Sequence, residues 1–102
     1  MSDGKRGPKP LGVRDWLFGS APRHQLLRVV VGDATPPAGW TKADLARAAG
    51  VTTKGGVDGH VAGLAAVGLL RIGRDGRWHP GTSRGLAAAI RRVLAELDEV
   101  AA

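Results

Sequence analysis

Residues 41–70, TKADLARAAGVTTKGGVDGHVAGLAAVGLL, constrain the fold more than any other part of this chain. Apolar residues recur at helical spacing on both sides of Gly50 and Val51, which predicts two helices joined by a tight turn. The second segment, residues 52–64, contains four glycines, and each glycine inside a helix costs ~1 kcal/mol relative to alanine. We therefore expect this helix to depend on burial of Val57, Val61 and Leu64 rather than on its own propensity.

The start of the first of these two helices is marked by agreeing signals. Thr41 is followed three residues later by Asp44, a short-armed version of the capping box. Trp40 precedes the cap and can pack on Leu45 as a hydrophobic staple. A helix is therefore predicted to begin after Thr41 and to end at Gly50, where glycine accepts a left-handed backbone.

The flanking sequence predicts one helix before this pair and a hairpin and a helix after it. Ser20 can cap a helix that has Pro22 in its first turn and ends near Gly32. Residues 70–72 alternate in polarity, and GRDG at 73–76 is a hairpin turn signal before a short strand at 77–79. The segment that follows, residues 82–102, is the clearest amphipathic helix in the chain.

The positive charge is concentrated in two parts of the chain, whose net charge is +6. Residues 1–14 mix lysine and arginine with glycine and proline, which predicts a flexible basic arm before a domain at residues 15–81. Residues 71–92 carry six arginines against one aspartate. This pattern favours an anionic partner such as nucleic acid, although a charged run is also typical of a merely solvated surface.

Several function classes find no support in the sequence. There is no cysteine, and His24, His60 and His79 are scattered without ligand spacing, so we expect neither a metal site nor a cofactor. The chain has no phosphate-binding loop and no Ser/His/Asp arrangement, so we expect no enzymatic activity. No apolar run approaches the ~18 residues of a membrane span, and the polar start does not suit a signal peptide. These features predict a cytoplasmic protein without membrane contacts.

The order helix, helix, turn, helix, hairpin and helix resembles the winged helix-turn-helix domain of bacterial transcriptional regulators of the ArsR and MarR type. The resemblance covers roughly residues 17–97: LFGSAPRHQLLRVVV is similar to the first helix, TKADLARAAGV to the second, VDGHVAGLAAVGLL to the recognition helix and RIGRDGRWHP to the wing. It implies a mainly α fold with a small β-hairpin wing, and a nucleoid-associated regulator that binds double-stranded DNA. The chain departs from that family's polar recognition helix at Gly55, Gly56, Gly59 and Gly63.

The predicted DNA contacts lie near the third helix or the hairpin, and are Lys42, Thr52, Thr53, Lys54, Gly56, Asp58, His60, Arg71, Arg74 and Arg77. Basic side chains there would contact phosphates, and glycine near a helix start would let backbone N–H groups approach them. The other interpretation of the glycines is close helix packing. Since few side chains remain for base edges, the alternative function is a winged-helix module for protein interaction. The sequence predicts no particular small-molecule effector.

The last helix also predicts self-association. Its apolar stripe is wider than a small core needs and consists of Leu86, Ile90, Val93, Leu94 and Leu97. This favours a homodimer, which would place two recognition helices one turn of DNA apart, ~34 Å. The competing interpretation is that the helix folds back onto the first helix of its own chain.

Overall fold

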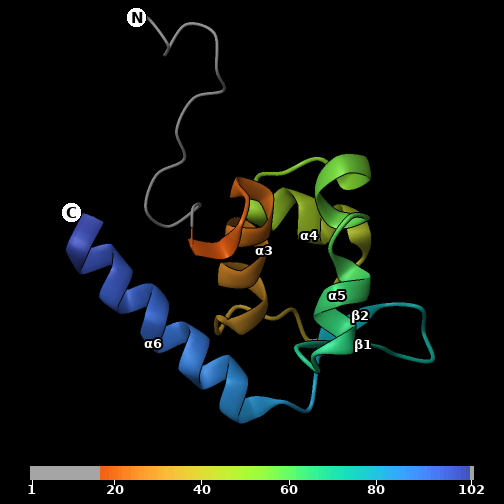
Figure 1. Ribbon diagram of the computed structural model, residues 1–102. Helices are drawn as coiled ribbons and strands as arrows, with labels where there is room; N and C mark the ends of the chain where they lie inside the picture. The colour runs from red at the N-terminus through yellow and green to blue at the C-terminus, as the bar shows by residue number, and fades with distance from the viewer. Residues whose placement is uncertain (1–16, 102) are drawn as a thin grey trace, which may run out of the picture.

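The computed structural model describes residues 17–101, and the arm predicted at residues 1–14 lies outside this range. The elements are α3 Ala21–Val31, α4 Lys42–Ala49, η1 Thr53–Val57, α5 Val61–Ala66, β1 Leu70–Ile72, β2 Trp78–Pro80 and α6 Arg84–Ala101. In Figure 1 the hairpin of β1 and β2 projects from one side of the molecule and α6 runs along the other. The fold is mainly helical with a small antiparallel hairpin, which confirms the coarse prediction.

Helix α3 begins and ends where the sequence predicts. The Ser20 hydroxyl accepts a hydrogen bond of 3.1 Å from the backbone N–H of Arg23, and Pro22 occupies the first turn. Proline is tolerated there because its missing N–H would have had no partner inside the helix. The helix stops at Val31, with Gly32 as its C-cap.

The predicted capping box of α4 is present. The Thr41 hydroxyl accepts from the Asp44 N–H, and the Asp44 carboxylate accepts from the Thr41 N–H, each at 3.0 Å. The hydrogen bond from the Thr41 backbone is the main cause that lowers the pKa of Asp44 below its ordinary value. Both staple residues, Trp40 and Leu45, are buried, and Gly50 ends the helix with a left-handed φ of 69°.

A single third helix does not form, which corrects the sequence prediction. Residues Thr53–Val57 make a wider, π-helical turn, in which the Asp58 N–H donates to the Thr53 carbonyl at 2.9 Å. Thr52 caps this turn by accepting from the Gly55 N–H at 3.2 Å. A break follows at residues 58–60 before α5 begins. The glycines therefore divide the predicted helix into two short pieces.

One of these glycines is required by packing. Gly56 is buried, and a Cβ at this position would lie 2.8 Å from the Val51 side chain. Real Cβ atoms do not come so close to their neighbours, so a side chain here would force the turn away from Val51. At Gly63 in α5, by contrast, a Cβ would meet nothing within 4 Å.

The hairpin is attached to the start of α4 through the backbone. Strands β1 and β2 pair in the register Leu70↔Pro80, Arg71↔His79 and Ile72↔Trp78. The residue that opens β2 also forms an antiparallel bridge with Trp40: their N–H and carbonyl groups exchange hydrogen bonds of 2.7 and 2.8 Å. These two hydrogen bonds fix the start of β2, next to the hairpin turn, beside the capping box of α4.

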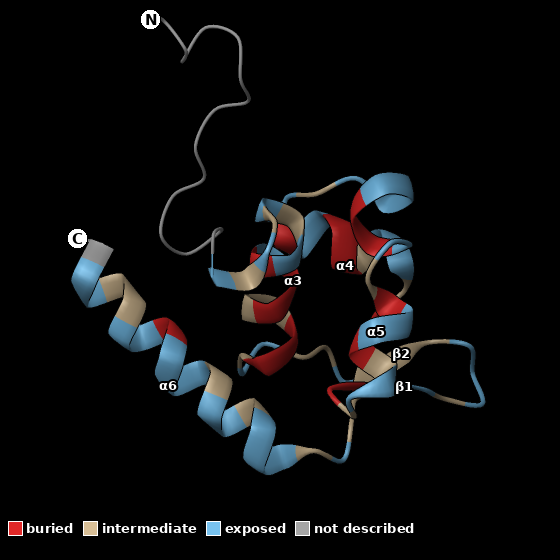
Figure 2. Cartoon of the chain, viewed as in Figure 1, coloured by how far each residue is buried: buried red, intermediate tan, exposed pale blue. Residues whose placement is uncertain are grey.

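The core lies between α3, α4, η1, α5 and the start of β1, as the red segments in Figure 2 show. Its most deeply buried side chains are Leu26, Trp40, Leu45, Val57 and Leu70. Helix α6 adds Leu94, which is 5% exposed, with Ala87 and Ile90 partly buried against the same cluster. The interpretation that α6 folds back on its own chain is therefore correct for these residues, and Leu94 is removed from the predicted dimer contacts.

Two ion pairs hold α6 in this position. The Arg28 guanidinium on α3 donates two hydrogen bonds to the Asp98 carboxylate, at 3.1 and 2.5 Å. Just beyond the same end of α3, Arg91 donates to Asp33 at 3.2 Å. The bidentate pair of Arg28 and Asp98 has the more specific geometry, because both carboxylate oxygens accept a hydrogen bond.

Alanine substitutions at Gly56 and at Gly63 are expected to change the free energy of unfolding in opposite directions. We expect Gly56→Ala to lower the free energy of unfolding by about 1–3 kcal/mol, because the new methyl group overlaps Val51. We expect Gly63→Ala to raise it by up to ~1 kcal/mol, because alanine favours a helix and has free space there. Urea unfolding of both variants measures the difference. Equal stabilities would show that Gly56 is not held by its contact with Val51.

Candidate nucleic-acid interface

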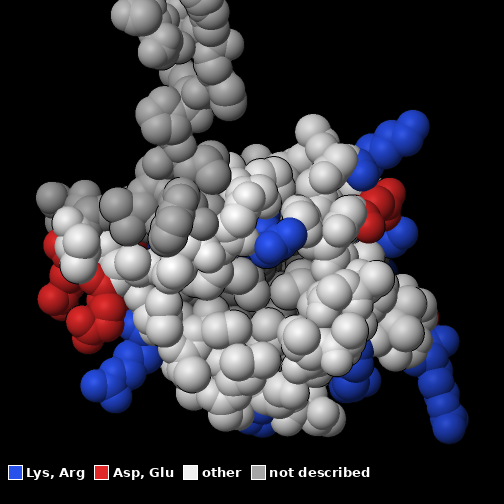
Figure 3. Space-filling view, viewed as in Figure 1, with Lys and Arg blue, Asp and Glu red and all other residues white. Residues whose placement is uncertain are grey.

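The predicted DNA contacts do not all fall on one surface. Three cations form what we call the basic edge: Lys54 on η1, Arg71 on β1 and Arg74 at the hairpin tip. All three side chains are exposed, and none has a carboxylate partner within residues 17–101. In Figure 3 the basic side chains over η1 and over the hairpin project from the same edge of the molecule. The other predicted contacts have partners or neighbours that give them different roles.

Lys42 and Asp58 neutralise one another beside the basic edge. The Lys42 ammonium lies 2.7 Å from the Asp58 carboxylate, and both side chains are close to half exposed. The pair connects the first residue of α4 to the residue that ends η1. Thr53, which precedes Lys54 on η1, is exposed. Thr52 instead uses its hydroxyl as a cap, so its role is structural.

The hairpin tip is ordered by its own polar groups. The Asp75 carboxylate accepts from the Arg77 N–H at 3.0 Å and lies 3.4 Å from the His79 ring. The first of these bonds is the main cause that lowers the pKa of Asp75. Gly76 completes the turn with a φ of 78°. Asp75 makes no ion pair with Arg74, whose side chain is exposed at the tip.

Arg77 connects the hairpin to α4 rather than extending the basic edge. Its guanidinium lies 3.9 Å from the Asp44 carboxylate, the group that also closes the capping box. The same Asp44 carboxylate also lies 3.2 Å from Arg47, so it forms ion pairs with two arginines. We therefore assign Arg77 a positioning role and remove it from the candidate DNA contacts.

Gly56 and α5 do not supply the contacts predicted for a recognition helix. Gly56 is buried within η1 and its N–H donates to the Thr52 carbonyl at 3.0 Å, so this N–H is not free to bind a phosphate. The exposed positions of α5 are Ala62, Gly63 and Ala66, and none has a hydrogen-bonding side chain. Discrimination between base pairs in the major groove relies mainly on such side chains. The face of α5 therefore cannot read base edges through polar contacts.

His60 lines an apolar groove that the sequence did not predict. The groove has a volume of about 440 Å³ and lies between α3, α5 and α6, where Arg23, Val67 and Leu86 also line it. Burial is the main cause that lowers the pKa of His60, and the charge of Arg23 lowers it further. The ring of His60 therefore favours its neutral form, which does not attract phosphate.

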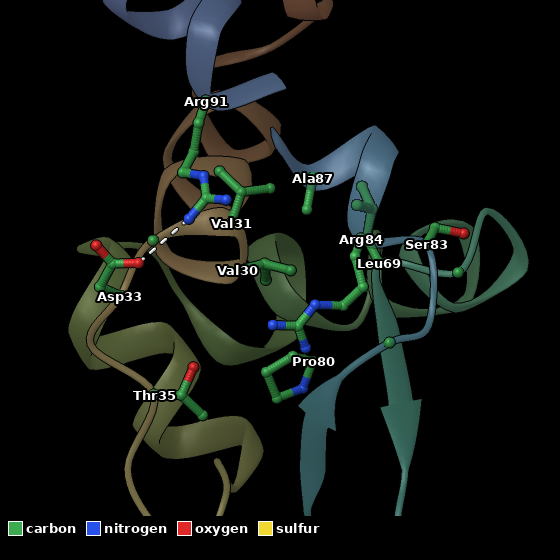
Figure 4. Close-up of a pocket in the computed structure, with 13 residues that line it drawn as sticks. Val30, Val31, Asp33, Thr35, Leu69, Pro80, Ser83, Arg84, Ala87 and Arg91 are labelled. Carbon is green, nitrogen blue, oxygen red and sulfur yellow. Dashed lines mark hydrogen bonds and ion pairs between the residues drawn. The ribbon is translucent and has the colours of Figure 1, made fainter. Parts of the chain in front are cut away.

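A second cavity, of about 230 Å³, lies between the end of α3, the base of the hairpin and the start of α6. Figure 4 shows the guanidinium of Arg84 pointing into it toward Pro80, while Arg91 is held by Asp33. The Ser83 hydroxyl donates to the Val67 carbonyl at 2.9 Å and closes one side. Arg84 and Arg91 are among the six arginines of residues 71–92, but their positions in the sequence did not predict that both would line one cavity.

Comparisons with known proteins identify no relative: no family model, no curated protein and no solved structure matches this chain. Within residues 17–101, no three His, Cys, Asp or Glu side chains are grouped as ligands for a metal ion. None of the helices in this range combines the length and the apolar character that crossing a membrane requires.

The environment of His60 predicts its titration. We expect an NMR midpoint below the ordinary value of 6.5, and we expect Arg23→Gln to raise it only part of the way, because burial is the larger cause. Since the unfolded chain binds the proton more readily, His60 should make stability fall as the pH drops below about 6.5. The His60 ring resonance is identified as the one that is missing from the spectrum of the His60→Gln variant. A midpoint at or above 6.5 would contradict this placement of the ring.

Proposed function

We propose that this protein binds double-stranded DNA as a small transcriptional regulator with a winged helix-turn-helix fold. The order of α3, α4, the η1–α5 pair, the hairpin and α6 is compatible with that architecture. The backbone bridge between Trp40 and Trp78 holds the hairpin beside α4, where a wing would lie. The net charge of +6 supports an anionic partner.

The observation that carries this proposal is the basic edge. Lys54, Arg71 and Arg74 protrude without a carboxylate partner among residues 17–101, although nearby Lys42 and Arg77 each have one. An unpaired exposed cation keeps its full charge available for a phosphate, and each such contact releases a counterion from the duplex. The edge spans two separate elements, so it would follow a DNA backbone over some distance.

Most of the affinity would then come from phosphates and little from base edges. Only Thr53 and Lys54 combine exposure with a polar side chain on η1, and α5 offers none. Sequence preference in such a protein depends on a few contacts and on the shape of the duplex. We therefore expect a modest ratio between binding to a preferred site and binding to random DNA.

The second candidate function is protein interaction through the groove that His60 lines. Val67 is 51% exposed and Leu86 is 42% exposed on its walls, so apolar surface is available to a partner. A groove between helices is a common binding site for an amphipathic helix. This alternative requires no contact by the basic edge, and variants of that edge therefore distinguish the two functions.

The phosphate contacts can be tested with a random 20-base-pair duplex, by fluorescence anisotropy at several salt concentrations. We expect Arg74→Ala to weaken binding and to reduce the slope of log K against log salt by about one, because one counterion fewer is released. Lys54→Ala should behave alike. Arg84→Ala is the matched control, since it removes the same charge from the cavity between α3 and α6.

Two outcomes would contradict a defined phosphate-binding edge. An equal loss in Arg74→Ala and Arg84→Ala would indicate attraction by net charge alone, without a defined edge. Unchanged binding in both Arg74→Ala and Lys54→Ala, with the fold intact, would favour the protein-interaction function. Thr53→Ala should instead lower the preference for a selected site by roughly 1–3 kcal/mol if its hydroxyl meets a base.

A further inference from the structure

The cavity between the end of α3, the base of the hairpin and the start of α6 receives two arginine side chains from one helix. Arg84 and Arg91 are seven residues apart on α6, so they lie on the same face, about 10 Å from one another along the helix axis. Both line this cavity, and Figure 4 shows the Arg84 guanidinium pointing into it. A small ligand in the cavity would therefore meet two cations.

The charge of these two arginines is only partly neutralised by the chain itself. Arg84 forms no ion pair with a carboxylate among residues 17–101. Arg91 lies 3.2 Å from Asp33, but the Asp33 side chain is 94% exposed. An ion pair with such an exposed member adds little stability, so a competing anion can displace Asp33 at small cost.

One wall of the cavity is fixed by close contacts between backbone segments. The Gly81 N–H donates to the Leu69 carbonyl at 2.9 Å, and the Ser83 N–H donates to the Gly68 carbonyl at 3.0 Å. Gly68 has a φ of 80°, and a Cβ there would overlap the Ser83 side chain. A Cβ at Gly81 would overlap the Gly68 carbonyl. These contacts hold the start of α6 against the hairpin, so the point from which Arg84 enters the cavity is set before a ligand binds.

The remaining surroundings also favour an oxyanion. Arg84 is the first residue of an 18-residue helix that has no acidic residue in its first turn, and the N-terminal end of a helix carries a partial positive charge. Thr35 adds a hydroxyl to the lining. Guanidinium groups bind the oxygens of phosphates and carboxylates through pairs of N–H donors.

We propose that this cavity binds the phosphate group of a small ligand, which Arg84 and Arg91 hold once Asp33 has moved out. A phosphate dianion matches two guanidinium groups, whereas a single carboxylate would leave one of them without a partner. The volume of about 230 Å³ is below the ~300–1,000 Å³ of pockets for drug-sized ligands, so the ligand is inorganic phosphate or a small phosphate monoester.

The phosphate of a DNA backbone is a less suitable occupant. It carries one charge and has a sugar on each side, so it fits poorly into a cavity that three elements of the chain surround. The three residues of the basic edge, Lys54, Arg71 and Arg74, do not line this cavity. The proposed phosphate site is therefore separate from the proposed DNA interface and does not depend on it.

Inorganic phosphate is the probe for this site. The amide NMR shifts of the full chain are followed while phosphate replaces chloride at constant ionic strength, and we expect saturable changes at residues 81–87. Arg84→Gln and Arg91→Gln should each raise the dissociation constant for phosphate by roughly tenfold or more, because each removes charge-assisted hydrogen bonds. Asp33→Asn should lower it severalfold, because the competing carboxylate is gone. General damage to the fold cannot explain such a gain.

Arg92→Gln is the matched control. It removes the same charge from the neighbouring position of α6, where Arg92 lines a shallow hollow with Val93 and Leu97 instead of the cavity. Its affinity for phosphate should equal that of the unmodified protein. Weaker binding in Arg84→Gln and Arg91→Gln, together with tighter binding in Asp33→Asn, supports the site. Shifts that do not saturate, or equal weakening in Arg84→Gln and Arg92→Gln, overturn it.

A random DNA duplex distinguishes the two sources of phosphate. We expect the duplex to leave the phosphate-dependent shifts of residues 81–87 in place, because the cavity and the basic edge are different surfaces. Displacement of phosphate from the cavity by the duplex would show that a backbone phosphate occupies it, and would overturn the proposal of a small ligand. Saturable phosphate binding in a protein that binds no duplex would support this site while contradicting the proposed function.

Discussion

The backbone bridge between Trp40 and Trp78 is the constraint on which the rest of the candidate interface depends. It joins the last residue before the α4 cap to the first residue of β2 by two short hydrogen bonds. Gly39 makes this approach possible: its φ is 82°, and a Cβ there would lie 2.6 Å from the His79 ring and 2.8 Å from the Trp78 carbonyl. With the hairpin fixed in this way, Arg77 reaches Asp44, and Arg74 is left free at the tip.

The parts of the fold that were predicted correctly from the sequence are those determined by interactions between residues close together in the chain. A cap depends on residues three positions apart, so Ser20, Thr41 and Asp44 could be assigned from spacing alone. The hairpin turn is local in the same sense. The close contact of Gly56 with the Val51 side chain is different, because no periodic pattern reports how near a backbone will come to a side chain. The groove beside His60 is likewise made by three elements that are distant in sequence.

The glycines of the third helical region illustrate why one explanation could not serve for all. Gly56 is fixed by contact with a side chain, and at Gly59 a Cβ would come within 3.3 Å of the Gly55 carbonyl. Gly63 has open space and lies on the wall of the apolar groove. Close packing therefore accounts for Gly56, while the contact at Gly59 is tight but less restrictive. The proposed attraction for DNA is assigned to the side chains of the basic edge.

Helix α6 shows how one apolar stripe can serve two surfaces. Periodicity gives the width of the stripe but not which part of it meets α3. In the structure Leu94 lies in the core, and the exposed ion pairs of Arg28 and Arg91 add only a small stabilisation to this packing. Val93 and Val100 are left exposed. In Figure 1 α6 lies on the side of the molecule opposite the hairpin, so the apolar surfaces of α6 are separate from the basic edge.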